Sequence, residues 1–268
     1  MPIETRFLDS GGRRIAYSDS GGNGGAVFLA HGFGLDRSMF AAQVAELGER
    51  WRIVAWDSPG HGDSPESAEP FSYWDLARDQ VALMDALGIE RAAVGGVSQG
   101  GFTALRTALT APERVSALLL VDTEAGSLDP ADAEAYAGLF GALAAQGPLP
   151  ELVTPLAGQI VGDHPAGREQ ARIWQERGVP LGEAVRCLTG RDDVVDRLPG
   201  IAAPALLVRG ELDASIPPER MELLFDGLAH PTEVQVVDGA WHSPPVTHPG
   251  ATTALLRAFL SGELRPVR

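Results

Sequence analysis

The stretch Ala92-Ala-Val-Gly-Gly-Val-Ser-Gln-Gly-Gly101 leads a short apolar run into a serine that is flanked by glycines. Residues 92–97 have the length and β-branched content of a buried strand, and helical spacing follows at 101–109. Ser98 therefore stands at a strand-to-helix turn, the position of the nucleophile in a Gly-x-Ser-x-Gly elbow. Small residues at 96 and 100 let the two backbones approach. The same five residues also fit a plain glycine-rich turn, so other segments of the chain are needed to distinguish the two interpretations.

Strand-like and helix-like segments alternate on both sides of this turn. Apolar runs of strand length recur at 26–30, 52–56, 115–121, 205–208 and 233–237, and helical spacing is found at 40–47, 73–87 and 218–228. Such alternation predicts a mostly parallel, doubly wound α/β sheet. Residues 5–9 and 13–19, joined by Ser10-Gly11-Gly12, read instead as a hairpin. We therefore expect an antiparallel edge at the N-terminal end of the sheet.

Between residues 125 and 198 the strand signal disappears. The segment is rich in Ala, Leu, Glu and Arg, and it is broken at Gly147-Pro148, His164-Pro165 and Val179-Pro180. Because strand-like sequence resumes at Ala203, we interpret residues 125–198 as a helical insertion within one core domain formed by 1–124 and 199–268. This segment is called the insertion below.

Composition excludes several classes of function. The formal charge of the 268 residues is −15, which argues against binding to nucleic acid or to an anionic membrane. All 21 basic residues are arginines, so a Schiff-base lysine and a P-loop lysine are absent. The single cysteine, Cys187, forms no internal disulfide, and the N-terminal residues lack the apolar run of a signal peptide. We expect a cytoplasmic protein that acts on a small molecule, with its oligomeric state open.

A serine hydroxyl needs a base, and His242 is the best candidate among the six histidines. It lies late in the chain, in a loop after the strand-like residues 233–237, where a loop reaches over the sheet. The other five stand in turns, in the insertion or directly before proline; they are His31, His61, His164, His230 and His248.

The base needs a carboxylate that fixes its tautomer and stabilises the imidazolium. Asp213 follows the predicted strand at 205–208 and gives the chain order Ser, Asp, His. Asp122 follows the preceding strand and emerges at the same edge of the sheet, so it remains a competitor. We prefer Asp213.

Backbone N–H groups are expected to stabilise the oxyanion that forms when a carbonyl carbon is attacked. Gln99 offers its amide at a helix N-terminus, and Phe33 offers a second amide in the loop His31-Gly32-Phe33-Gly34. Gly32 and Trp241 are predicted to lie at the substrate pocket. We expect mostly solvated positions for a further set of polar side chains, namely Glu124, His164, Arg168, Arg172, Trp174 and Arg177.

Together these segments resemble the α/β-hydrolase superfamily, in its serine-nucleophile branch of small bacterial esterases, enol-lactonases and perhydrolase-like proteins. The resemblance also rests on Asp57-Ser-Pro-Gly-His-Gly-Asp-Ser64, a turn whose role in the family is structural. It implies an eight-stranded sheet with a helical cap, or lid, inserted after the sixth strand. Two positions depart from the common pattern, since Trp241 and Thr247 replace a glycine and a glutamate around the histidine.

The sequence therefore predicts a serine hydrolase that cleaves a carboxylic ester or lactone of a small, mainly apolar substrate through an acyl-enzyme on Ser98. The predicted set is Ser98, Asp213 and His242, with the amides of Phe33 and Gln99, and neither a metal nor another cofactor is expected. Two alternatives stay open. One is hydrolysis of a carbon–carbon bond in a vinylogous diketone, and the other is a non-catalytic ligand receptor.

Overall fold

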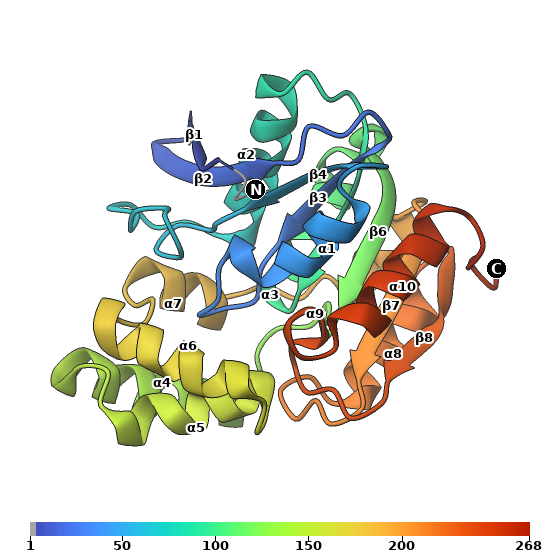
Figure 1. Ribbon diagram of the computed structural model, residues 1–268. Coiled ribbons are helices and arrows are strands. Elements are labelled where there is room, and N and C mark those ends of the chain that lie inside the picture. Colours follow the sequence, from blue (N-terminus) through green and yellow to red (C-terminus); the bar gives the residue numbers. More distant parts are fainter. Residues whose placement is uncertain (1–3) are drawn as a thin grey trace.

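The strands form one eight-stranded sheet in the order β1-β2-β4-β3-β5-β6-β7-β8 (Figure 1). The computed structural model describes residues 4–268. The β1–β2 and β2–β4 pairs are antiparallel and every other pair is parallel, which confirms the predicted mixed sheet. The strands are β1 Arg6–Ser10, β2 Arg13–Asp19, β3 Ala26–Ala30, β4 Arg52–Trp56, β5 Ala92–Val97, β6 Val115–Val121, β7 Ala205–Gly210 and β8 Pro231–Val237.

β1 ends at Ser10, one residue later than the predicted strand end at Asp9. The turn of the hairpin between β1 and β2 is formed by Gly11 and Gly12. Both glycines have positive φ, 53° and 78°. A two-residue turn with that backbone matches the right-handed twist of the flanking strands.

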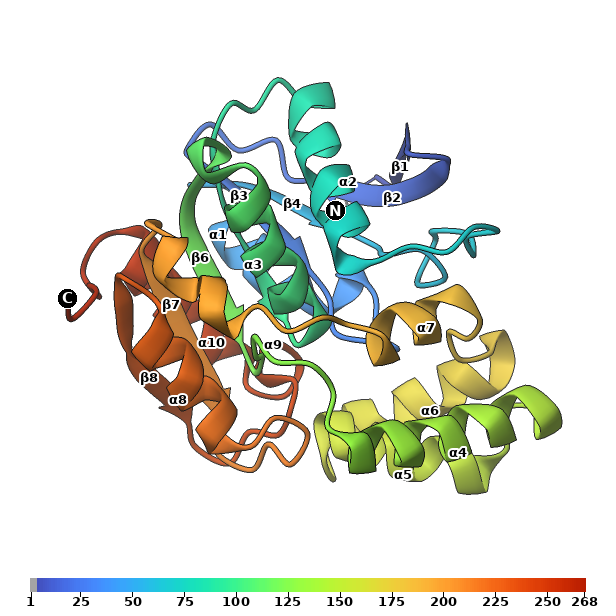
Figure 2. The ribbon, with the colours of Figure 1, turned by 180° about the vertical axis from the view of Figure 1, so that it is seen from behind.

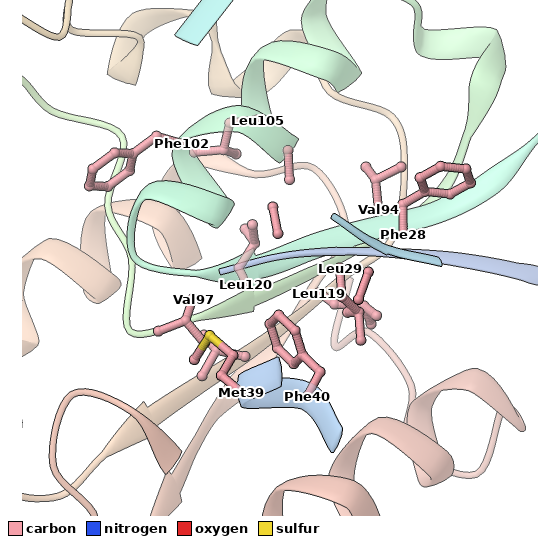
Figure 3. Close-up of a cluster of buried hydrophobic side chains, with 14 of the residues drawn as sticks. Phe28, Leu29, Met39, Phe40, Val94, Val97, Phe102, Leu105, Leu119 and Leu120 are labelled. Carbon is pink, nitrogen blue, oxygen red and sulfur yellow. The ribbon is translucent and has the colours of Figure 1, made fainter. Parts of the chain in front are cut away.

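The central strands are apolar on both sides because helices cover both faces of the sheet. Figure 3 shows Phe102 and Leu105 of α3 (Gln99–Thr110) on one face, and Met39 and Phe40 on the other. Neighbouring strand residues point to opposite faces, as the two-residue period of a strand requires. Phe28 and Leu29 of β3 show this alternation in Figure 3, and both are buried.

Five further α-helices of residues 4–268 complete the core region. α2 (Tyr73–Ala86) packs against α3, whereas α1 (Ala41–Leu47) packs against α10 (Pro249–Leu260) on the opposite face. α8 (Pro218–Gly227) connects β7 to β8. The short α9 (Pro244–Thr247) and α10 were not predicted, although a proline at the first position of each helix was a readable signal.

Four α-helices lie between β6 and β7, within the segment called the insertion. They are α4 Pro130–Gln146, α5 Pro150–Val161, α6 Pro165–Arg177 and α7 Glu183–Thr189. Each of the first three begins at a proline and ends before a glycine with positive φ, so local sequence sets both ends. Figures 1 and 2 show α4, α5 and α6 as a group beside the sheet, near the end of β6.

None of the helices in residues 4–268 combines the length and the apolar character that crossing a membrane would require.

Candidate active site

Ser98 occupies a strained turn between β5 and α3. Its φ and ψ are 52° and −114°, a region that residues other than glycine rarely adopt. Such strain persists only where the surroundings impose it. Here the Ser98 N–H donates to Val121 O at 3.0 Å, and the Thr123 hydroxyl donates to Ser98 O at 2.8 Å.

Glycine is required beside Ser98 because β3 and α3 lie against each other there. A Cβ built at Gly96 or at Gly100 would overlap the carbonyl oxygen of Ala30 in β3. The structure thus supplies the physical reason for both small residues of the Gly-x-Ser-x-Gly pattern.

His242 and Asp213 meet in loops at the same edge of the sheet. His242 Nδ1 lies 2.9 Å from Asp213 Oδ2, and both side chains are buried. Asp213 Oδ1 also accepts the backbone N–H groups of Ser215, at 2.8 Å, and Ile216, at 3.2 Å. With a proton on Nδ1 directed at Asp213, the His242 ring has Nε2 available to accept a proton.

The surroundings keep Asp213 ionised. Burial alone would raise the pKa of its carboxyl group, but the charge and hydrogen bond of His242, with the hydrogen bonds from Asp122 and Ser215, hold that pKa below the usual value. The ionised Asp213 therefore stabilises the folded protein at pH values above the pKa that this group has in the unfolded chain. That stabilisation is lost as the pH falls through the pKa of Asp213 in the folded protein.

The competitor, Asp122, does not bond to His242. It directly follows β6, has no exposed surface, and accepts the Gly210 N–H at 2.8 Å. It lies beside Asp213, whose backbone N–H donates to the carbonyl oxygen of the same Gly210 at 3.2 Å.

The residues of both predicted amide donors lie near Ser98. Gln99 is the first residue of α3, so its N–H has no acceptor within the helix. The loop that carries Phe33 comes close to Ser98, since a Cβ built at Gly32 would stand 3.9 Å from Ser98 Cβ. A helix N-terminus and an adjacent loop amide are the usual construction of a site for a developing oxyanion.

The Asp57–Ser64 turn supports this loop. Buried His31 accepts the Ser58 N–H through Nε2 at 3.0 Å. Asp57, in turn, accepts the backbone N–H groups of Arg37, at 2.7 Å, and Asp63, at 3.0 Å. The turn therefore holds His31 in place without reaching the cavity.

A cavity of about 250 Å³ opens in front of Ser98 and His242. That volume lies just below the usual range for small-molecule sites. Its walls are mostly apolar and come from both the core and the insertion; they include Phe33, Phe102, Leu128, Tyr136, Phe140, Leu156, Ile160, Leu188, Ile216 and Pro217.

The cavity wall includes a buried ion pair that the sequence did not reveal. Arg191 Nη2 lies 2.5 Å from Glu124 Oε1, and both side chains are almost fully buried. Arg191 also donates to the carbonyl oxygens of Gly126 and Leu188, both at 3.2 Å. Burial raises the pKa of Glu124, and Arg191 and Arg220 oppose that rise. Arg191 follows α7, so only the tertiary fold brings it to Glu124.

Gly32 and Trp241 do not border this cavity. Gly32 lies against Val97 and Ser98, and the Trp241 indole packs on Gly162 at the end of α5. Trp174, expected among solvated side chains, is instead buried and donates its indole N–H to Gly34 O at 2.8 Å. Arg172 is exposed and pairs with Glu169 and Glu176.

Within residues 4–268, no three His, Cys, Asp or Glu side chains gather in an arrangement that suits a metal ion.

Residues 25–249 match the family description "alpha/beta hydrolase fold". A pimeloyl-[acyl-carrier protein] methyl ester esterase of Neisseria meningitidis is 31% identical over 264 residues, with 89% of this chain and 94% of that protein covered.

Two solved structures are similar over nearly the whole chain. A thermophilic esterase from Thermogutta terrifontis superposes with a TM-score of 0.86 at 28% identity, covering 97% of this chain and 98% of its own. The enol-lactonase from Burkholderia xenovorans LB400 gives 0.83 at 26% identity, with 96% and 100% covered.

Proposed function

The chain belongs to the alpha/beta hydrolase fold family, and from this premise we propose that it is a serine hydrolase. Its substrate is a carboxylic ester or lactone of a small, mainly apolar compound. The observation that carries the proposal is the strained Ser98, which lines a mostly apolar cavity that His242, bonded to Asp213, also lines.

In the proposed reaction, His242 Nε2 takes the proton of Ser98 while Oγ attacks the carbonyl carbon. The amides of Phe33 and Gln99 donate to the oxyanion, and Asp213 stabilises the imidazolium. His242 then gives the proton to the departing alkoxide, which leaves an acyl group on Ser98. Water, deprotonated by His242, attacks this acyl-enzyme, and the acid departs as Ser98 regains its proton.

We propose that residues 125–198 act as a lid over a core domain of residues 1–124 and 199–268. Side chains of α4 and α5, among them Tyr136, Phe140 and Ile160, form the cavity wall opposite Ser98, which supports this role. The insertion then sets the chain length that the enzyme accepts.

A substrate panel tests the proposal. It comprises p-nitrophenyl esters of increasing acyl length and a series of lactones, with Ser98→Ala as the blank. Because the cavity is small and apolar, we expect the highest kcat/KM for short, uncharged acyl groups, and a steep fall for chains longer than the cavity. A vinylogous diketone in the same panel tests carbon–carbon bond hydrolysis.

A fluorophosphonate probe provides the second measurement. We expect rapid labelling of Ser98 that is lost in His242→Ala, because only an activated serine reacts quickly with such a probe. A folded protein that takes no label would contradict the proposal and favour a ligand receptor on the same fold.

The Glu124–Arg191 pair yields a prediction about specificity. Glu124→Gln leaves Arg191 as an unpaired cation in the cavity wall, while the amide oxygen still accepts its hydrogen bond. We expect the ratio of kcat/KM for an ester with a terminal carboxylate to that for the uncharged ester of equal length to rise about tenfold. The uncharged ester is the internal control, and a ratio that stays constant would mean that the acyl chain does not reach this pair.

A further inference from the structure

Asp122, the residue after β6, is held in an unfavourable backbone conformation. Its φ is 41°, and among residues 4–268 only Ser98 shares a positive φ without being glycine. Such a conformation costs about 1–3 kcal/mol and is concentrated at functional sites. Both strained residues follow adjacent parallel strands, β5 and β6, at the edge of the sheet where the proposed active site lies.

The two oxygen atoms of the Asp122 carboxyl group differ in their hydrogen bonds. Oδ1 accepts the Gly210 N–H at 2.8 Å. Oδ2 is buried, and no N–H or hydroxyl group of residues 4–268 donates to it. Gly210 links the two acids, since its N–H donates to Asp122 Oδ1 and its carbonyl oxygen accepts the Asp213 N–H at 3.2 Å. The carboxyl group of Asp213 is the acidic group that acts on Asp122. Two carboxyl groups form a hydrogen bond only when one of them keeps its proton.

The surroundings decide which carboxyl group keeps the proton. Asp213 receives three N–H donors, from His242, Ser215 and Ile216, whereas Asp122 receives one. The charged groups that act on Asp122 are Asp213, which opposes its ionisation, and Arg209, which favours it. Burial, with the charge of Asp213, raises the pKa of Asp122 well above its ordinary value.

We propose that Asp122 is a positioning residue that stays in its neutral acid form and donates a hydrogen bond to Asp213, fixing that carboxylate for His242. This inference rests on the proposed function, in which His242 is the base. Asp122 touches neither the substrate nor the reacting atoms.

Protonation of Asp122 is tested without any activity measurement. The folded protein holds this proton at pH values where the unfolded chain has lost it, so Asp122 makes wild-type stability fall as the pH rises above about 4. Asp122→Asn removes that slope. We expect the Tm of Asp122→Asn, relative to the wild type, to increase steadily between about pH 5 and pH 8.

Asp19→Asn is the matched control, because Asp19 is a buried carboxylate paired with Arg52 at 2.8 Å. Burial would raise the pKa of Asp19, but Arg52 and the Gly21 N–H hold it below the ordinary value. The relative Tm of Asp19→Asn is therefore expected to decrease as the pH rises out of the acid range. If Asp122→Asn followed the same direction as Asp19→Asn, Asp122 would be ionised and the proposal would be wrong.

Activity tests the positioning role. Asparagine keeps one donor for Asp213 and one acceptor for Gly210, so Asp122→Asn is expected to retain kcat within about fivefold. Asp122→Ala loses the donor, and we expect kcat to fall about 10–100-fold with little change in KM, as for other supporting groups. An Asn variant as impaired as the Ala variant would overturn the positioning role.

The pH profile separates this role from a merely structural one. If Asp122 is neutral, Asp122→Asn leaves the acid limb of kcat/KM in place. If Asp122 were instead ionised, Asp122→Asn would remove a negative charge beside the Asp213–His242 pair. The acid limb of kcat/KM would then shift by about one pH unit or more, which would contradict the proposal. If the wild type hydrolyses nothing in the panel, the proposed function fails, whereas the two Tm series still report on Asp122.

Discussion

Replacing Ser98 by alanine is expected to lower kcat for the preferred ester by at least about 10⁴-fold. The hydroxyl oxygen is the atom that forms the acyl-enzyme, and no neighbouring group replaces it. Since the cavity walls are unchanged, KM or ligand affinity should stay within about threefold. Steady-state kinetics and the melting temperature of the purified variant provide the check.

Ser215→Ala is the matched control for this substitution. Ser215 also lines the cavity, but its contact with Asp213 is made by the backbone N–H, which alanine keeps. We expect Ser215→Ala to retain at least about a third of the activity. Equal losses in the two variants would show that Ser98 is a pocket residue and not the nucleophile.

The double variant with His242→Ala sharpens the interpretation. Groups that act as one unit lose little more when the second is removed, so the double variant should be about as inactive as Ser98→Ala alone. Losses that multiply would indicate that Ser98 and His242 act independently.

The strand-to-helix turn at Ser98 was predictable because its determinants are local. The apolar run, the two small residues and the following helix are neighbours in the sequence, and the parallel sheet follows from the same alternation. The choice between Asp122 and Asp213 was not local. Both follow adjacent strands, paired at Val121 and Val208, and both reach the same edge. The two aspartates are distinguished by the position of the His242 loop, which brings the imidazole to Asp213 and not to Asp122.

The cavity was the least predictable part of the molecule. Arg191 and Glu124 are 67 residues apart, and their pairing depends on how the insertion folds back between β6 and β7. Trp241 directly precedes His242, yet it packs on Gly162 of the insertion. Proximity to a functional residue in sequence therefore does not place a side chain in the pocket, because consecutive loop residues point in different directions.

Gly100→Ala is expected to produce a large loss of stability. The added methyl group would overlap the Ala30 carbonyl oxygen, so β3 and α3 would have to separate. Overlap with backbone cannot be relieved by rotating a side chain, and we expect a loss of about 3 kcal/mol or more. In thermal unfolding this corresponds to a Tm lower by about 6–12 °C.

Gly141→Ala supplies the matched control in α4. Gly141 is an exposed helical glycine, and a Cβ built there meets nothing within 4 Å. Alanine reduces the conformational entropy of the unfolded chain, so this variant is expected to be more stable by about 0.4–1 kcal/mol. The same chemical change thus has opposite signs at two helical sites, because only one of them faces a strand. If Gly100→Ala melted no lower than Gly141→Ala, close approach of β3 and α3 would not be the reason for glycine at position 100.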